Sequence, residues 1–260
     1  MSPERSIHPT AAVDHRAVVG SGVEIGPYAV VEEDVTLGDG VRIGPHAHIA
    51  RGSRLAEEVQ VFTGAAVGNV PQDLKFAGEE TTLEVGPRTI VREFCTLHRG
   101  TDDRSRTVIG ADCLLMAYVH VAHDCIIGDH CILANAVQLG GHVVIGDWVI
   151  IGGSVPVHQF CRIGDHAMVG GGYRVVQDVP PFLRVAGEPL RPAGINSIGL
   201  RRRGFSDEAL AELKRVYRLL YRSDLNTSQA VQRIREEVPD TPEVEQMLDF
   251  IASSERGMVG

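Results

Sequence analysis

The sequence has no long apolar run, no excess of positive charge and no even set of cysteines. No apolar stretch approaches the roughly 20 residues that a membrane-spanning helix needs, and residues 1–6 are polar, unlike a secretion signal. Lysine and arginine number 25 against 34 acidic residues, and the net charge of −9 argues against non-specific nucleic-acid binding. We therefore expect a soluble, cytoplasmic protein without stable membrane insertion.

A branched aliphatic residue recurs at every sixth position through most of the chain. The register holds over 7–67, resumes over 85–97 and again over 109–175. Three positions break the phase: Asp73, Glu79 and Asp103. A repeat of this kind that pauses and returns in register predicts a regular scaffold with loops that leave it, at 71–83 and 101–107.

The six-residue period fits neither a helix nor a simple alternating strand. A small or β-branched residue follows four positions after each aliphatic, so both positions face inward. Glycine often follows the aliphatic directly, as at Gly26 and Gly38, where a tight corner needs positive φ or close backbone approach. Each hexapeptide is then a short strand and a turn, and three of them close a triangular coil that stacks about 4.8 Å from the next.

The cysteines fall on the inward small position of this repeat. They are Cys95, Cys113, Cys125, Cys131 and Cys161. Free cysteine packs as a small apolar residue, and the odd count argues against a disulfide framework and for a reducing compartment.

The composition changes after Val179, where prolines interrupt the repeat. We divide the chain into a repeat domain at 1–180, an extended linker at 181–204 and a helical domain at 205–260. Ser206 is a plausible N-cap for the first helix; a second covers 228–238, and a third begins at Thr241 with Pro242 in its first turn. These helices are expected to cover the open end of the solenoid.

Basic residues cluster between 201 and 222 although the protein is acidic overall. They are Arg201, Arg202, Arg203, Lys214, Arg215, Arg218 and Arg222, against the acidic Asp207, Glu208 and Glu212. Such a patch suits phosphate or an acidic protein partner. A solvated helix face is the alternative.

Histidines avoid the inward positions and gather along one predicted edge. They are His98, His120, His123, His142 and His158. Residues 18 apart stack on adjacent coils, so His142, 19 residues beyond His123, should lie beside it. One interpretation is a general base that deprotonates a hydroxyl or amine attacking a thioester, with Asp124 orienting the imidazole. The other is a zinc site shared between subunits.

Several segments closely resemble those of the UDP-N-acetylglucosamine acyltransferases, over essentially the whole chain. They are GNVPQDLKFAGE (68–79), LHRGT (97–101), HVAHDCIIG (120–128), LGGH (139–142), VHQFC (157–161), QDVPP (177–181) and RRRGFS (201–206). The resemblance implies an all-β solenoid plus α, a left-handed parallel β-helix with a C-terminal α-helical domain, that assembles as a homotrimer with its active cleft between subunits.

The resemblance also implies an activity: transfer of a 3-hydroxyacyl chain from acyl carrier protein to the glucosamine 3-position of UDP-N-acetylglucosamine. This is the first step of lipid A biosynthesis and needs no cofactor. His123 matches the general base, Asp124 stands beside it, and the Gly141 N–H matches the oxyanion donor. Substrate-contacting positions are matched by Asp73, Lys75, His120, His142, His158 and Gln159, and nucleotide or phosphate contacts by Asn196, Arg202 and Arg203.

Three of these assignments have simpler alternatives. Asp73 and Lys75 could be ordinary loop residues next to Pro71. His158 and Gln159 could cap a corner of the scaffold. Arg202 could contact only the acidic acyl carrier protein.

Two departures from the family pattern concern specificity. Ile198 stands where a glutamate associated with nucleotide-sugar binding is common, which leaves open whether the acceptor is a 3-hydroxyl or a 3-amino group. Tyr173 occupies an inward position that is otherwise small, so the coil must bulge or the ring must turn outward. Gly171 matches a position where a small residue leaves room for a long acyl chain, and we expect a long donor with Tyr173 trimming the slot.

Two other classes of protein remain as alternatives. A trimeric zinc hydratase of the carbonic anhydrase type would bind metal and lose activity on chelation. A non-enzymatic trimeric scaffold would explain the repeat. It would explain neither the two loops, after which the repeat resumes in the same register, nor the histidines along one edge.

Overall fold

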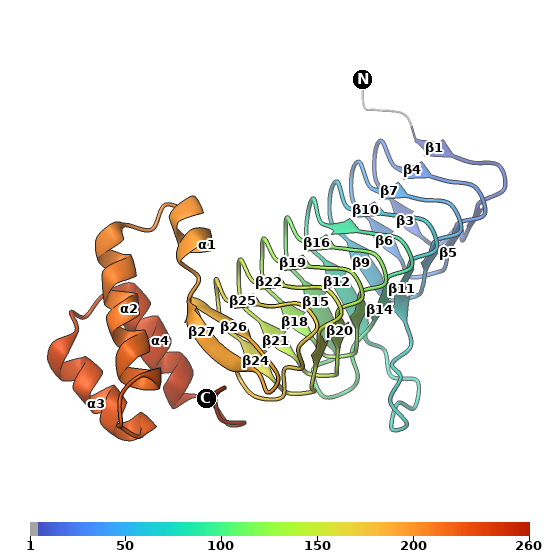
Figure 1. Cartoon of the computed structure of the whole chain (residues 1–260). Coiled ribbons are helices and arrows are strands. Elements are labelled where there is room, and N and C mark those ends of the chain that lie inside the picture. The colour runs from blue at the N-terminus through green and yellow to red at the C-terminus, as the bar shows by residue number, and fades with distance from the viewer. Residues whose placement is uncertain (1–4) are drawn as a thin grey trace.

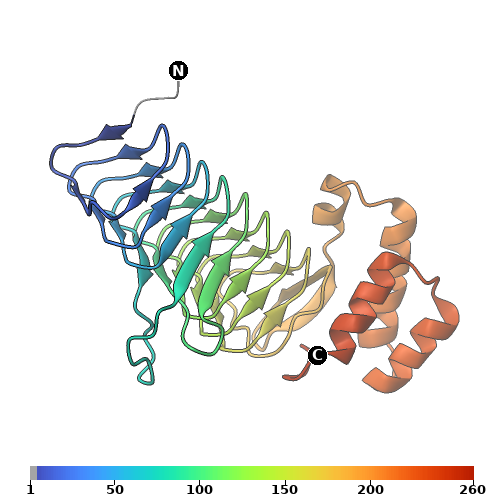
Figure 2. The same ribbon diagram turned by 180° about the vertical axis from the view of Figure 1, so that it is seen from behind.

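The computed structural model describes residues 5–260 and shows a three-sided column of stacked coils with a helical bundle at one end (Figures 1 and 2). The predicted parallel β-helix with a C-terminal helical domain is confirmed. Up to β25, successive strands of the chain go in turn to three sheets, called A, B and C, so that every third strand is a neighbour within its sheet.

The strands of each sheet are two to five residues long. Sheet A contains β1 (Ser6–Ile7), β4 (Glu24–Ile25), β7 (Arg42–Ile43), β10 (Gln60–Val61), β13 (Ile90–Val91), β16 (Leu114–Leu115), β19 (Ile132–Leu133), β22 (Ile150–Ile151), β25 (Met168–Val169), β26 (Leu183–Ala186) and β27 (Arg191–Ile195). Sheet B contains β2 (Ala12–Val13), β5 (Val30–Val31), β8 (His48–Ile49), β11 (Ala66–Asn69), β14 (Thr96–His98), β17 (His120–Val121), β20 (Gln138–Leu139) and β23 (Pro156–Val157). Sheet C contains β3 (Val18–Val19), β6 (Thr36–Leu37), β9 (Ser53–Leu55), β12 (Thr82–Val85), β15 (Arg106–Ile109), β18 (Ile126–Ile127), β21 (Val144–Ile145) and β24 (Arg162–Ile163).

The repeat aliphatics form continuous ladders inside the column. Ile43 pairs in parallel register with Ile25 on one side and Val61 on the other. The small inward positions are equally buried, and all five cysteines are free and buried, as predicted. The core is therefore a stack of nearest-neighbour layers rather than one central cluster.

The corners of the coils have an unexpected conformation. Positive φ occurs three residues after the aliphatic, at mostly non-glycine residues such as Tyr28 and His46. The glycine directly after the aliphatic is needed for close approach instead: a Cβ at Gly38 would lie 2.7 Å from the Ala56 carbonyl carbon of the next coil. Each coil thus turns at three corners, here named A–B, B–C and C–A after the sheets they join.

Both predicted loops leave the column at the B–C corner. Between the strands they span 70–81 and 99–105, so each ends two residues before the expected 71–83 and 101–107. The second is named the 100–105 loop. The difference arises because β12 and β15 extend backward to pair with each other, Thr82 opposite Arg106. The 70–81 loop is the long excursion that hangs from the column below β11 and β14 in Figure 1.

Residues 181–204 do not form the extended linker that we predicted. β26 continues sheet A in parallel with β25, β27 returns antiparallel, and α1 (Ser197–Arg202) follows. Alternating burial of Leu183 and Val185 explains the strand, because these side chains cover the last coil of the core. Prolines at the turn and at Pro192 hide this pattern in the sequence.

Three further helices follow the predicted order. They are α2 (Asp207–Tyr221), α3 (Thr227–Glu237) and α4 (Pro242–Ala252). Ser206 and Thr241 are the N-caps of α2 and α4, as expected from the sequence. Arg162, on the last strand of sheet C, donates to the Ser253 carbonyl and lies 4.6 Å from the Phe250 ring centroid, so α4 covers that end of the sheet. Within residues 5–260, no helix combines the length and apolarity needed to cross a bilayer.

Candidate active site

His123 and Asp124 sit side by side at the B–C corner, between β17 and β18. Asp124 adopts the positive φ of a corner residue, 59°, which turns its carboxylate back against the column, and its side chain is completely buried. His123 is largely buried, with 13% of its side chain exposed. The repeat geometry therefore holds an acid and an imidazole together at a fixed point.

The carboxylate of Asp124 is held by donors from the 100–105 loop. Thr101 donates from its amide at 3.0 Å and its hydroxyl at 2.6 Å, and the Arg104 amide donates at 3.3 Å. Burial opposes ionisation, but the hydrogen bonds from Thr101 and His123 outweigh it and lower the pKa of Asp124. Asp124 is thus an anion in a nearly dry site.

The hydrogen bond from His123 to Asp124 defines which ring nitrogen can act as a base. Nδ1 lies 2.8 Å from Asp124 Oδ2. Because a carboxylate only accepts, Nδ1 carries the proton and Nε2 is the nitrogen with a free lone pair. The pair therefore has the arrangement of an oriented general base.

Gly141 lies directly against this imidazole, one coil further along. A Cβ at Gly141 would be 2.6 Å from His123 Cε1 and 2.8 Å from Nε2. Within residues 5–260, the Gly141 amide donates no hydrogen bond. Only glycine fits here, and its N–H remains available beside the base.

His142 packs against the other side of the pair. Its ring centroid is 5.1 Å from that of His123, and it stacks on Phe160 at 4.5 Å. Nδ1 lies 3.2 Å from Asp103 Oδ2 but not in hydrogen-bonding geometry. Burial, followed by the opposing attraction of Asp124, leaves the pKa of His142 below its ordinary value, which favours the neutral ring.

His98 and His120 extend the histidine row along sheet B. Their ring centroids are 5.2 Å apart, and Thr96 Oγ1 lies 2.8 Å from His120 Nδ1. Burial first, then the charges of His98 and His123, lowers the pKa of His120 to about 4. The convergence predicted for the five histidines is confirmed for His98, His120, His123 and His142, and the row consists mainly of neutral imidazoles.

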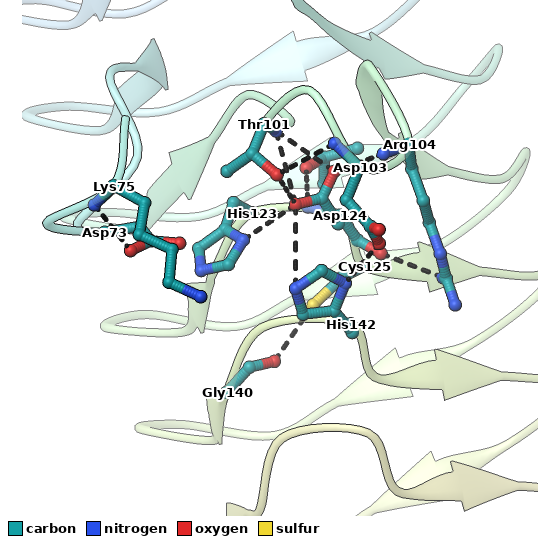
Figure 3. A network of polar contacts seen from close by, with 11 residues as sticks. Asp73, Lys75, Thr101, Asp103, Arg104, His123, Asp124, Cys125, Gly140 and His142 are labelled. Atoms are coloured by element: carbon teal, nitrogen blue, oxygen red, sulfur yellow. Dashed lines mark hydrogen bonds and ion pairs between the residues drawn. The ribbon is translucent and has the colours of Figure 1, made fainter. Parts of the chain in front are cut away.

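The 70–81 loop brings Asp73 and Lys75 to the same corner. His98 Nδ1 bonds to the Val70 carbonyl at 2.6 Å and so anchors the loop where it leaves the column. Asp73 Oδ1 accepts from the Lys75 amide at 2.9 Å, which shapes the turn at the tip. Figure 3 shows both residues on the loop beside His123.

His158 and Gln159 follow β23 at the same corner, two coils beyond His123. Both are exposed, and His158 Nδ1 lies 3.1 Å from the Gln159 carbonyl. They lie on the rim of the site rather than in its buried network, and their contact with substrate stays a prediction.

The other predicted residues do not lie at this corner. Gly171 and Tyr173 are at the A–B corner, where Tyr173 is half-buried and the coil is irregular, with only an isolated bridge at Val175. Arg202 lines a cavity of about 800 Å³ over the outer face of sheet A, with Ile198 also on its wall. Asn196 and Arg203 are engaged within the chain, through His166.

The cavity at sheet A is positively charged. Its cationic residues are Arg184, Arg202, Lys214 and Arg218, and no carboxylate lines it. Sheet A is the side of the triangular column opposite the B–C corner, so in one chain this cavity and His123 face different directions.

A zinc ion fits the histidine cluster poorly. Atoms of His123, Asp124 and His142 lie within 4.8 Å of one another, as a metal site needs. Asp124 Oδ2, however, already accepts from Thr101 and His123, so a cation could bind only by displacing those donors.

Three residues of the site were not identified from the sequence. Thr101 and Arg104 hold Asp124, and the Thr107 hydroxyl accepts from the Asp124 amide at 2.8 Å. The break in the repeat at Asp103 located the loop that carries Thr101 and Arg104. It did not indicate that the loop donates hydrogen bonds to Asp124.

Comparisons with known proteins point in one direction. Residues 178–259 match the family model described as UDP-N-acetylglucosamine O-acyltransferase, domain 2, and residues 16–51 and 106–141 match the bacterial transferase hexapeptide model. The chain is 61% identical to the acyl-[acyl-carrier-protein]–UDP-N-acetylglucosamine O-acyltransferase of Chlorobaculum tepidum, covering 96% of this chain and 95% of that one.

Solved structures agree with this. The UDP-N-acetylglucosamine acyltransferase of Bacteroides fragilis superposes with a TM-score of 0.96 at 44% identity, covering 98% of this chain and 100% of that one. The O-acyltransferase of Moraxella catarrhalis gives a TM-score of 0.94 at 41% identity, with 98% and 99% covered.

Proposed function

This chain belongs to the acyl-[acyl-carrier-protein]–UDP-N-acetylglucosamine O-acyltransferase family, and from that membership we propose its chemistry residue by residue. It transfers an acyl group from acyl carrier protein to UDP-N-acetylglucosamine, the first step of lipid A biosynthesis. In the finer form proposed here, the group is a 3-hydroxyacyl chain and the acceptor is the glucosamine 3-hydroxyl. The observation that carries the proposal is the Asp124–His123 pair with Gly141 against its free nitrogen.

The reaction follows from the direction of that hydrogen bond. His123 Nε2 removes the proton from the 3-hydroxyl as its oxygen attacks the thioester carbonyl. The Gly141 N–H stabilises the negative charge that develops on the carbonyl oxygen, a contribution of about 3 kcal/mol in other oxyanion sites. The C–S bond then breaks, the ester forms, and the imidazolium returns its proton to the carrier thiolate. Asp124 stabilises the imidazolium between these steps.

We infer that the active unit is a homotrimer whose sites lie between subunits. Arg202 and the cationic cavity face away from His123 in one chain, so a nucleotide sugar can touch both only across a subunit boundary. Leu74, at the tip of the 70–81 loop, is fully exposed, which suits a side chain covered by a neighbouring copy. The cytoplasm is the proposed location.

Product analysis tests the reaction. The protein would be mixed with acyl carrier proteins bearing 3-hydroxyacyl groups of different lengths and with UDP-N-acetylglucosamine or its 3-amino analogue, and products identified by mass spectrometry. An ester at the 3-position from the hydroxyl sugar is expected. Acylation of the amino sugar alone would replace the acceptor, and hydrolysis without transfer would overturn the proposal.

Subunit mixing tests the shared site. His123→Ala chains and Arg202→Ala chains would be unfolded, mixed in equal amounts and refolded together. If one site takes His123 from one subunit and Arg202 from the next, about one site in four recovers both residues. No recovery in verified mixed trimers would show that each site lies within one chain.

Two residues bear on the proposed specificity, Ile198 on the acceptor group and Tyr173 on the length of the acyl chain. Ile198 is 67% exposed and lines a cavity without a carboxylate, so the 3-amino sugar remains the second candidate. The half-buried Tyr173 lies next to Gly170, where a Cβ would come 3.2 Å from its ring. This crowding supports a ring that trims the acyl slot, and a preference for the shortest donors would contradict a long chain.

A further inference from the structure

Helix α1 is attached at both ends to a single residue, His166. At its start, Asn196 Nδ2 donates to the His166 carbonyl at 2.9 Å, while Asn196 Oδ1 accepts from the Gly199 amide at 3.2 Å. At its end, an Arg203 guanidinium nitrogen lies 3.3 Å from His166 Nδ1. A helix of six residues has little stability of its own, so these attachments set its position.

The His166 ring is itself held in an aromatic stack along the C–A corner. It lies parallel to Trp148 at 6.4 Å and to Phe182 at 5.7 Å, and the edge of Phe205 approaches at 5.0 Å. The Arg203 guanidinium also sits 5.1 Å from the Trp148 ring centroid, a cation–π contact. The ring can therefore neither rotate nor tilt without disturbing its neighbours.

The helix carries residues that face the cationic cavity. Ile198 and Arg202 line it, and Arg202 is exposed, with no ion-pair or hydrogen-bond partner within residues 5–260. The direction of Arg202 is thus decided by the position of α1. Arg203, although adjacent, is directed to the opposite side and binds His166 instead.

We propose that His166 is a positioning residue for the nucleotide-sugar site, acting through Arg203 and α1 to aim Arg202 at the diphosphate. The inference rests on the proposed function, in which Arg202 binds phosphate. His166 must be neutral to accept from Arg203, and burial, followed by the charge of Arg203, lowers its pKa. A displacement of about 1 Å in a binding group is enough to weaken a site substantially.

Substitutions can separate the two functions of the ring. His166→Phe keeps the stack and removes the acceptor, while His166→Gln keeps an acceptor and removes the stack. His130→Phe is the matched control, because His130 stacks on Trp148 at 4.0 Å from the other side and, among residues 5–260, its side chain forms an ion pair only with Asp112 and none with α1. We would measure KM for UDP-N-acetylglucosamine and kcat for each, and UDP affinity by calorimetry.

We expect His166→Phe to raise KM and the UDP dissociation constant about tenfold, as for one lost hydrogen bond to a charged group, with kcat within about twofold. His166→Gln should recover part of this loss, and His130→Phe should match the wild type. Unchanged KM in His166→Phe, or a fall in kcat alone, would overturn the proposal.

A second measurement keeps the inference separate from the proposed function. Hydrogen exchange of the α1 amides should become faster in His166→Phe and stay unchanged in His130→Phe. If the wild type neither binds UDP nor acylates the sugar, the proposed function has failed, whatever α1 does. If the wild type is active and α1 exchange is unaltered in His166→Phe, the positioning role has failed.

Discussion

Asp112 and Asp124 occupy the same position of the repeat and nearly the same backbone conformation, with φ of 54° and 59°. At the C–A corner, Asp112 forms a bidentate pair with Arg88, both distances 2.7 Å, and 30% of its side chain is exposed. At the B–C corner, Asp124 is fully buried and bonds to Thr101, Arg104 and His123.

The difference lies in what was inserted next to each corner. The chain turns tightly at Asp112, whereas the 100–105 loop covers Asp124 and excludes water from it. The repeat supplies a rigid corner, and the inserted loop converts one such corner into a site for chemistry. Buried charge and supporting donors, rather than residue type, distinguish the two.

The largest effect should come from removing the base. His123→Ala is expected to lower kcat about 10³- to 10⁴-fold, as for loss of a general base, with an unchanged unfolding midpoint and oligomeric state. Steady-state assays with acyl carrier protein as donor and thermal unfolding check this. Activity near that of the wild type would remove the B–C corner from the reaction.

Exchanging each aspartate for asparagine tests the comparison directly. Asp124→Asn should lower kcat about 100-fold, because an amide can leave the proton on the wrong ring nitrogen. It should also lower the free energy of unfolding by about 1–3 kcal/mol. Asp112→Asn, the matched control, should change neither by much. Equal effects at the two corners would show that the inserted loop is irrelevant.

Crowding the imidazole should have a smaller effect. In Gly141→Ala the new methyl group meets the His123 ring. The imidazole must therefore move, while the backbone N–H of residue 141 is retained. We expect kcat to fall about 10- to 100-fold. Wild-type kcat in this variant, measured with an intact trimer, would mean that His123 does not approach the Gly141 amide during turnover.

The buried His120 predicts a loss of stability in acid. Between pH 6.5 and about 4 the unfolded chain protonates His120 while the folded chain does not. The free energy of unfolding should therefore fall as the pH drops through this window. His120→Asn should show a shallower slope, with the comparison at pH 8 as its control. Denaturant titrations from pH 4 to 8 measure both slopes, and parallel slopes would contradict the assignment.

The smallest effect belongs to the exposed pair. Arg88→Met should change the midpoint of denaturant-induced unfolding only slightly, because surface ion pairs contribute little, and should leave kcat unaltered. Chemical denaturation in low and high salt checks this. A loss of stability as large as that of Asp124→Asn would show that the contacts of the two aspartates contribute equally to folding.

Much of the architecture could be predicted, and the errors have identifiable causes. The six-residue register located the coils between residues 7 and 175, and a spacing of 19 brought His123 and His142 together, as found. The hairpin of β26 and β27 was missed because prolines suggested an extended chain. Positive φ was expected at glycines, but it occurs mostly at other residues, such as Asp124 and His166, three positions after the repeat aliphatic.

By itself, the sequence determined the coil, its period, the interruptions and the family, because each depends on local spacing that repeats along the chain. Only the tertiary structure decided which corner became the site. The donors to Asp124 come from another coil, 20 and 23 residues away in the chain. The attachment of α1 to His166 joins residues 30 and 37 positions apart. Such contacts depend on where an irregular loop or helix folds back, and no periodic pattern encodes that.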